Sequence, residues 1–376
     1  MKVSVSQTQL AHGLGIVSRA VSPRNTLPVL ANIMVATDEG RLRLSATNLE
    51  LGITCWIGTQ IEEEGSTTVP ARTFTDLVGK LPEGPVNLSL NTRTQTINVH
   101  SGTSSTDIKG IDAQEFPPIP VPDLSDGVTL NVTDFKEMIQ QVAFAASTDE
   151  ARPVLTGVLV VVDGNEISLA ATDGFRISVR KSELTSPVTR PFNAIVPARA
   201  LTELARIAAD GDEAIYMVMA PNRGQVIFHL KDVELVSQLI DGNFPDYKAI
   251  IPRSFKTRTI LSTSELLKAC QQAEIIAREG TNVARLNMAP SGDIRPSEVE
   301  VSSQTEEKGK SEIKLEATVD GVPLLIAFNV RFLREVLEVI KTPNVSIETN
   351  TATTPGLVRP VGDDHFMHVI MPMHLG

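Results

Sequence analysis

The 376 residues exceed what one ordinary hydrophobic core accommodates and suffice for two or three domains. Hydrophobic residues make up 41% of the chain, which excludes intrinsic disorder, and no apolar run is long enough for a membrane-spanning helix. The net charge of −11, taken alone, argues against nucleic-acid binding.

The beginning of the chain and its cysteines indicate a cytoplasmic protein. Residues 1–10 alternate apolar and polar side chains and lack the basic start and apolar stretch of a signal peptide. Cys55 and Cys270 have no second cysteine and no group of histidines nearby in the sequence, which favours free thiols in a reducing compartment over a zinc site. We therefore expect no membrane segment, no metal and no other cofactor.

One pattern occurs three times along the chain. Each copy opens with a short strand and a helix whose apolar residues recur every three to four positions, and Thr133 and Thr263 are predicted to be the N-caps of the second and third of these helices. The predicted opening strands are 2–6, 128–132 and 259–262, and the helices after them are 7–21, 133–147 and 263–279. Later in each copy a second helix is predicted, at 72–81, 199–209 and 331–341. A further strand is predicted after each of these helices, at 86–90, 214–219 and 345–349.

The middle of each copy is a pair of strands. In the second copy, strands at 158–162 and 166–171 are joined by the turn-forming residues Asp163-Gly164-Asn165. The first copy matches it, because Pro28-Val29-Leu30 and Pro153-Val154-Leu155 are 125 residues apart, as are Ala46-Thr47-Asn48 and Ala171-Thr172-Asp173. Such self-similarity at a fixed interval is typical of a chain built from repeated units.

The copies also end alike, at Phe116-Pro117, Phe244-Pro245 and Met371-Pro372. We therefore predict an α+β fold of three repeated domains, 1–123, 124–253 and 254–376, each with two helices packed on antiparallel sheets. Two charged stretches, Glu62-Glu63-Glu64 and residues 304–311, are interpreted as solvated hairpin tips.

Motifs for catalysis are missing from the sequence. It contains no Walker A, GxGxxG, HExxH or GxSxG pattern, and its six histidines are scattered. His365, His368 and His374 do not share one face of a strand, which argues against a metal cluster near the C-terminus. A binding or scaffold role is therefore favoured over catalysis.

Three segments carry a family resemblance: ATDGFR at 171–176, FPDY at 244–247 and VIMPMHL at 369–375. With the threefold repeat, they resemble the bacterial sliding clamps, which are the beta subunits of DNA polymerase III. The resemblance implies a non-catalytic processivity factor, so that any polymerase activity belongs to the complex. It also implies a head-to-tail homodimer that closes a ring of pseudo-sixfold symmetry around double-stranded DNA. The implied partners are the polymerase III alpha subunit, the clamp loader with its delta subunit, and other polymerases and repair proteins that carry short clamp-binding motifs.

The placement of the charges agrees with such a ring. The six predicted helices together carry a net charge of +2. Because the whole chain carries −11, the residues outside these helices carry −13. In the implied ring, helices line the hole and strands form the outer layer. DNA would then be held at the centre and repelled elsewhere, without sequence specificity.

The resemblance also implies three sets of site residues. The DNA-facing arginines would be Arg24, Arg72, Arg152 and Arg199. The dimer contact would use Ile275 and Ile276 at the end of a helix, and Thr106 and Ile108 on a facing edge strand. A cleft for short extended peptides would be lined by Leu155, Thr172, Gly174, Phe175, Arg176, Ile177, Pro245, Ile250, Phe332, Val369, Ile370, Met371, Pro372, Met373 and Leu375.

Two other classes of protein remain open at this point. The repeats are also compatible with a cytoplasmic interaction scaffold that never encircles DNA. The second alternative is a nucleotide-handling enzyme, and the lack of a phosphate-binding loop in the sequence disfavours this hypothesis.

Overall fold

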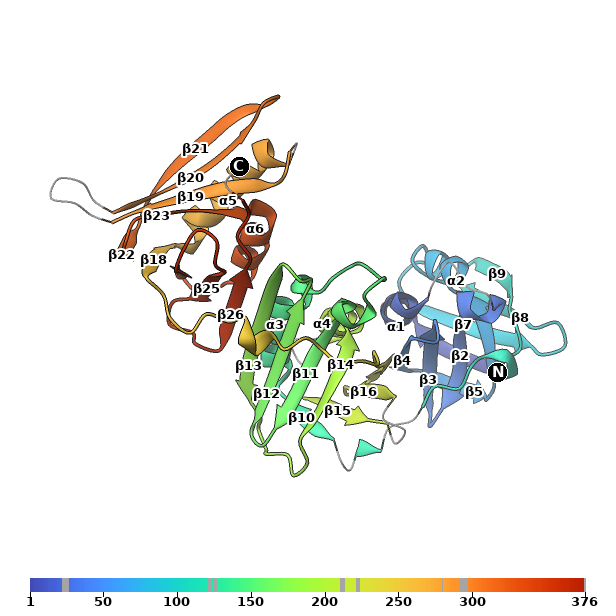
Figure 1. The fold of residues 1–376 in the computed structure, drawn as a ribbon. Helices are drawn as coiled ribbons and strands as arrows, with labels where there is room; N and C mark the ends of the chain where they lie inside the picture. Colours follow the sequence, from blue (N-terminus) through green and yellow to red (C-terminus); the bar gives the residue numbers. More distant parts are fainter. Residues whose placement is uncertain are drawn as a thin grey trace. The chain divides into compact units, whose positions relative to one another are not determined.

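The computed structural model describes residues 1–21, 27–120, 123–124, 127–209, 214–220, 224–278, 280–290 and 297–374 (Figure 1). Within these ranges, each copy of the sequence repeat contributes two α-helices and a set of antiparallel strands, which confirms the predicted α+β fold. The helices are α1 (Gln7–Val17), α2 (Ala71–Val78), α3 (Val132–Val142), α4 (Ala198–Ile207), α5 (Thr263–Ala277) and α6 (Val330–Val339).

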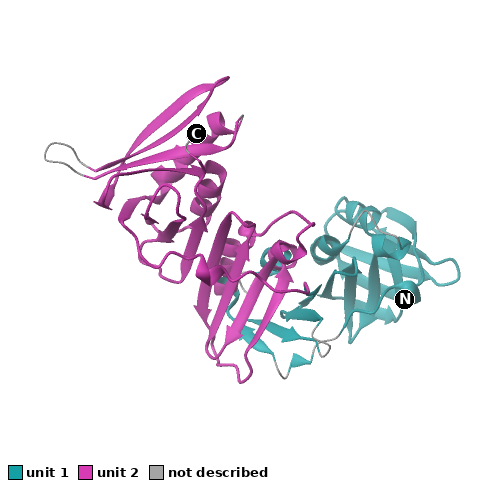
Figure 2. Cartoon of the chain, in the orientation of Figure 1, with its two compact units in different colours: residues 1–133, 203–239 teal, residues 134–202, 240–376 magenta. Residues whose placement is uncertain are grey.

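The described residues form two compact units (Figure 2). The first comprises residues 1–133 and 203–239 and holds a five-stranded and an eight-stranded sheet. The five-stranded sheet has the order β5 (Gln60–Glu63), β1 (Lys2–Ser6), β7 (Pro85–Asn91), β8 (Thr96–Ser101), β9 (Ser104–Lys109). The eight-stranded sheet has the order β10 (Val128–Leu130), β15 (Ile215–Met219), β16 (Gln225–His229), β17 (Val233–Gln238), β4 (Leu51–Gly58), β3 (Arg41–Thr47), β2 (Asn32–Asp38), β6 (Ser66–Pro70).

The second unit comprises residues 134–202 and 240–376 and holds a nine-stranded and a four-stranded sheet. The nine-stranded sheet has the order β14 (Phe192–Pro197), β11 (Gly157–Asp163), β12 (Glu166–Thr172), β13 (Arg176–Glu183), β26 (Phe366–Ile370), β25 (Gly356–Pro360), β24 (Asn344–Thr349), β18 (Thr257–Ser262), β22 (Thr318–Gly321). The four-stranded sheet has the order β21 (Gly309–Glu316), β20 (Glu298–Thr305), β19 (Val283–Ala289), β23 (Leu324–Asn329).

The sheets run from one copy of the repeat into the next. In the first unit, β17 of the second copy pairs with β4 of the first, with Leu235 opposite Ile53. In the second unit, β13 of the second copy pairs with β26 of the third, with Ile177 opposite Val369. Edge strands of neighbouring copies thereby satisfy each other's backbone groups, and the second copy shares a sheet with each of its neighbours.

The repeat is also visible in local structure. Both Pro-Val-Leu stretches form short 3-10 helices, Pro28–Ala31 and Pro153–Thr156, with proline in the first turn, where a missing N–H costs nothing. The strand pair predicted around Asp163 is confirmed as β11 and β12, and residues 304–311 do form the tip of the β20–β21 hairpin.

Three local predictions are wrong. Thr133 lies inside α3, which begins at Val132, directly after Asn131, a residue type that favours the N-cap position. Ser262, not Thr263, is the N-cap of α5, and its hydroxyl accepts a hydrogen bond from the Glu265 N–H at 3.4 Å. Residues 62–64 are no hairpin tip, because β5 pairs with β1 whereas β6 pairs with β2 of the other sheet.

A large core of the second unit lies under α5 and α6. Leu266, Ala269 and Cys270 of α5 are buried there with Leu333 and Val336 of α6. Every second residue of β26, such as Phe366 and Ile370, joins this core because side chains of a strand alternate between faces. α5 and α6 thus cover one face of the third copy's strands in the nine-stranded sheet. Among the described residues, no helix has the length and apolar character to cross a membrane.

Candidate functional site

A small apolar cavity of about 110 Å³ lies in the second unit, on the nine-stranded sheet. Its walls are mostly carbon, and its rim carries large apolar side chains that remain exposed: Phe175 at 61%, Ile250 at 44% and Met371 at 38%. The cavity is lined by Leu155, Thr172, Gly174, Phe175, Arg176, Ile177, Pro245, Tyr247, Ile250, Val369 and Met371. Exposed apolar side chains gathered around a hollow indicate a docking surface.

The floor of the cavity is one transverse row of the sheet. Thr172 of β12 lies opposite Ile177 of β13, and Ile177 lies opposite Val369 of β26. Ile177 and Val369 are buried in a small cluster separate from the core under the helices. The seam between the second and third copies of the repeat therefore supplies this floor.

One wall comes from the segment that connects the second and third copies. Pro245, Tyr247 and Ile250 line the cavity, and Tyr247 packs edge-on against Phe244 with ring centroids 6.3 Å apart. Burial raises the pKa of the Tyr247 phenol, so this wall stays uncharged at neutral pH. The sequence analysis missed Tyr247 as a lining residue, although it is the last residue of the FPDY segment.

The opposite wall is a tight turn between β12 and β13. The Asp173 Oδ1 accepts hydrogen bonds from the Phe175 and Arg176 N–H groups at 2.9 and 3.1 Å, and the Thr172 hydroxyl donates to the Arg176 carbonyl at 2.7 Å. Gly174 has φ +95°, a conformation that favours glycine. The Met371 N–H donates to the Phe175 carbonyl at 2.9 Å, which ties the C-terminal segment to the turn.

The Arg176 side chain points from this turn toward the helices and is 6% exposed. Its Nε donates to Asp173 at 3.1 Å, its Nη2 donates to the Phe144 carbonyl at 2.9 Å, and its Nη1 donates to Glu335 of α6. The guanidinium also lies over the ring of Phe332, with its carbon 4.3 Å from the centroid. Such a fully paired, buried arginine fixes the turn relative to α6.

The electrostatics of Glu335 follow from these contacts. Burial by itself would raise the pKa of the Glu335 carboxyl, but hydrogen bonds and charge from Arg331 and Arg176 outweigh burial and hold this pKa below its usual range. Glu335 is therefore an anion at neutral pH that accepts hydrogen bonds from Arg331 and Arg176, with Arg334 also 3.8 Å away.

A buried histidine lies beside Arg176. His368 of β26 is fully buried, its Nδ1 is 2.6 Å from the Ser178 hydroxyl, and its ring stacks on Phe144 with centroids 5.5 Å apart. Its Nε2 has no hydrogen-bond partner among the described residues. Burial, and next the charge of Arg176, lower the pKa of His368 well below 6.5, so the imidazole is neutral at pH 7.

Four of the described residues predicted for the cleft do not line this cavity. Ile370 is fully buried in the core under the helices, because it lies on the other face of β26 from Val369. Phe332 lies over Arg176 on the helix side of the sheet. Pro372 and Met373 lie beyond Met371, where the Met373 N–H donates to the Ala327 carbonyl at 2.8 Å. Leu375 is outside the described residues.

The predicted DNA-facing arginines that the structure describes are all exposed. Arg72 lies 3.8 Å from Asp76, and Arg152 lies 3.6 Å from Asp149. The Arg152 guanidinium also borders Gly174 at the cavity, which the sequence analysis did not anticipate. Arg199 is exposed near the start of α4, and Arg24 is outside the described residues. Their role in DNA binding stays a prediction.

The residues predicted for a dimer contact differ in exposure. Ile275 near the end of α5 is 58% exposed, whereas Ile276 is half-buried. β9 is an edge strand, as expected, and Thr106 on it is half-buried. Ile108 on the same strand is buried, at 5% exposed, and the part of these four residues in a dimer contact stays a prediction.

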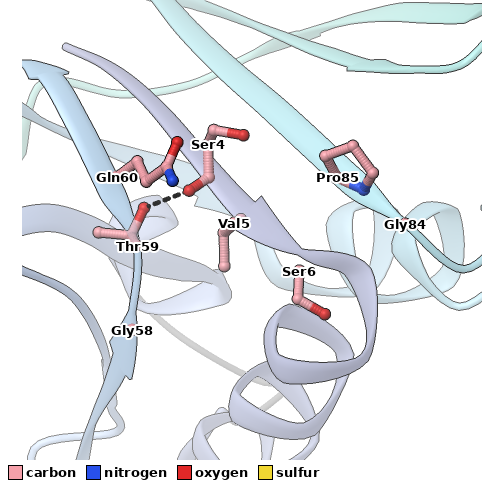
Figure 3. A pocket seen from close by; sticks show the side chains of 8 residues that line it. All are labelled: Ser4, Val5, Ser6, Gly58, Thr59, Gln60, Gly84 and Pro85. Atoms are coloured by element: carbon pink, nitrogen blue, oxygen red, sulfur yellow. Dashed lines mark hydrogen bonds between the residues drawn. The ribbon is translucent and has the colours of Figure 1, made fainter.

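A second hollow, of about 440 Å³, lies at the end of β1 (Figure 3). It is lined by Ser4, Val5, Ser6, Gly58, Thr59, Gln60, Gly84 and Pro85, and the Thr59 hydroxyl donates to the Ser4 carbonyl at 2.9 Å. None of these side chains is charged or titratable. Nor do three or more His, Cys, Asp or Glu residues come together as a metal site within the described ranges.

Comparison with known proteins gives one consistent match along the whole chain. Three family models of the DNA polymerase III beta subunit match this chain. The model of the N-terminal domain matches residues 1–120, that of the central domain residues 129–246 and that of the C-terminal domain residues 248–374. The chain is 35% identical to the beta sliding clamp of Synechococcus elongatus over 100% of both chains. It is 32% identical to the beta sliding clamp of Bacillus subtilis over 99% of both.

Solved structures give the same likeness. The sliding clamp from Bacillus subtilis superposes with a TM-score of 0.94 at 31% identity, covering 100% of both chains. A sliding clamp from Pseudomonas aeruginosa bound to griselimycin superposes with a TM-score of 0.92 at 26% identity, again over 100% of both.

Proposed function

The chain belongs to the family of DNA polymerase III beta subunits, and we propose that it acts through a helix-lined hole for duplex DNA and an apolar cavity for partner proteins. It is a sliding clamp, the non-catalytic processivity factor of DNA polymerase III. The domains would be 1–123, 124–253 and 254–376. Two chains would join head to tail, the end of α5 in one against β9 in the other.

The observation that carries the cavity's role is its exposed apolar rim. Phe175, Ile250 and Met371 surround a hollow with room for a single anchoring side chain. An extended peptide would bury an aliphatic or aromatic anchor there, and the flexible Met371 suits a surface that accepts several ligands. The partners would be the alpha subunit of the polymerase, the clamp loader through its delta subunit, and other polymerases and repair proteins.

The distribution of charge supports the role of the hole. Outside the predicted helices the chain carries −13, whereas the helices together carry +2. Duplex DNA would therefore be attracted only to the helix side, where Arg24, Arg72, Arg152 and Arg199 would contact phosphates. Phosphate contacts carry no sequence information, so the ring could slide. The lifetime on DNA would then follow the stability of the dimer contact, to which Thr106, Ile275 and Ile276 would contribute.

The cavity is tested by placing a charge on its rim. Ile250→Asp and Met371→Asp should each weaken binding of a labelled peptide with leucine and phenylalanine anchors by at least about tenfold, because a carboxylate would lose water against apolar groups. Fluorescence anisotropy with the full-length protein measures the dissociation constant.

The matched control is Val322→Asp, which changes an equally exposed apolar residue of the same unit outside the cavity. It should bind the peptide as the unmodified protein does. Equal peptide affinity in all three variants would place the binding surface elsewhere.

A further inference from the structure

One carboxylate connects the cavity to the helix side of the second unit. The Glu335 Oε2 accepts from Arg176, whose backbone is part of the cavity wall. Its other oxygen, Oε1, accepts from the Arg331 Nε at 2.7 Å. Each of the two oxygens therefore accepts a hydrogen bond from one arginine, and Arg334 is a more distant partner, with its Nη2 3.8 Å from Oε1. Glu335 thus bridges the buried Arg176 and the outer Arg331.

The two arginines differ in their access to solvent. The Arg176 side chain is 6% exposed, whereas that of Arg331 is 60% exposed in the first turn of α6. Arg331 corresponds in the repeat to Arg72 and Arg199. An anion approaching α6 from solvent can therefore reach Arg331 but not Arg176.

We propose that a DNA phosphate bound by Arg331 strengthens peptide binding in the cavity, with Glu335 carrying the coupling to Arg176. This inference rests on the proposed function. A phosphate that engages Arg331 draws its Nε away from Glu335. The carboxylate then has Arg176 as its principal partner, and their ion pair becomes stronger.

A stronger Arg176–Glu335 pair favours the arrangement in which the cavity is formed. Arg176 is held at the same time by Asp173 in the turn and by the Phe144 carbonyl in the 3-10 helix Ala143–Ala145, directly after α3. Movement of its guanidinium would disturb the turn that carries Gly174 and Phe175 at the rim. Anchoring the Arg176 guanidinium more firmly lowers the free energy that is needed to order the cavity wall when a peptide binds.

The size of the effect is limited by the exposure of the outer pair. Partly exposed ion pairs contribute modestly, so we expect duplex DNA to tighten peptide binding by about two- to fivefold. Coupling between two binding events is reciprocal, and the peptide should tighten duplex binding by the same factor. The coupling should fade at high salt, which weakens phosphate contacts.

The test is peptide binding by the full-length protein with and without a saturating short linear DNA duplex, followed by anisotropy of the labelled peptide. In the unmodified protein the duplex should lower the dissociation constant by about two- to fivefold. Arg331→Gln and Glu335→Gln should both abolish this response. Arg331→Gln changes an exposed side chain, so it carries the test if Glu335→Gln lowers stability.

The matched control is Glu338→Gln. Glu338 lies on the same helix and pairs with Arg334 at 2.7 Å, but it does not contact Arg176, so this variant should keep the response. A duplex effect that is absent from the unmodified protein, or that persists in Glu335→Gln, would overturn the coupling alone. Failure of the unmodified protein to bind the peptide would overturn the proposed cavity, and the coupling with it.

Discussion

At the residue scale, the second unit places two titratable groups in opposite settings around Arg176. Glu335 keeps its charge because it accepts hydrogen bonds from Arg176 and Arg331. His368 loses its charge because it is buried against Phe144 and close to the positive charge of Arg176. Both groups are therefore deprotonated at neutral pH: Glu335 is an anion that attracts Arg176, and His368 is neutral and does not repel it.

His368 makes stability depend on pH. Its pKa in the folded protein lies well below 6.5, so below pH 6.5 the unfolded chain binds a proton that the folded chain does not. The free energy of unfolding should therefore fall as the pH drops below 6.5, by at most about 1.4 kcal/mol per pH unit from this group. Denaturant unfolding from pH 7 to pH 5 measures the slope.

The double variant Ser178→Ala/His368→Phe should reduce this slope. It keeps a ring against Phe144 and leaves no hydroxyl without its partner. Ser178→Ala alone retains the buried imidazole and should keep the slope. An identical slope in the double variant would mean that other groups govern acid sensitivity.

At the element scale, periodicity predicted the existence and order of the helices, and the ends remained uncertain by a few residues. α3 begins at Val132, directly after Asn131, and adjacent polar residues such as Ser262 and Thr263 cannot be ranked as caps from sequence alone. The strand alternation that separates Val369 from Ile370 could have been applied to the C-terminal segment. The resemblance, which does not specify faces, included both residues in the cleft.

The end of α5 carries a second prediction. Ile275 is 58% exposed, which is unusual for an isoleucine on a helix with an otherwise buried apolar face. If two chains meet there, Ile275→Lys combined with Ile276→Lys should give a folded monomer, because an unpaired charge at the contact is costly. Sedimentation velocity measures the assembly state, and circular dichroism checks the fold.

Ser264→Lys, at the opposite end of the same helix, is the control and should leave the assembly unchanged. A double variant that still sediments as a dimer at low concentration would move the contact to another surface.

At the scale of the whole molecule, continuous sheets connect the copies of the repeat. The pairing of β17 with β4 and of β13 with β26 joins segments far apart in the sequence. The sequence indicated three similar units but not these seams, because any exposed strand edge can accept several partners. The cavity depends on the second seam, so its lining from Ile177, Pro245 and Val369 could be anticipated only through the family resemblance.

The central claim is that two chains close a ring around DNA, and negative-stain electron microscopy of the purified protein tests it most directly. Closed rings of two chains with an opening wide enough for duplex DNA are the expected result. Elongated single chains without a hole, at concentrations where other clamps are dimeric, would contradict it. They would indicate an interaction scaffold built from the same repeats.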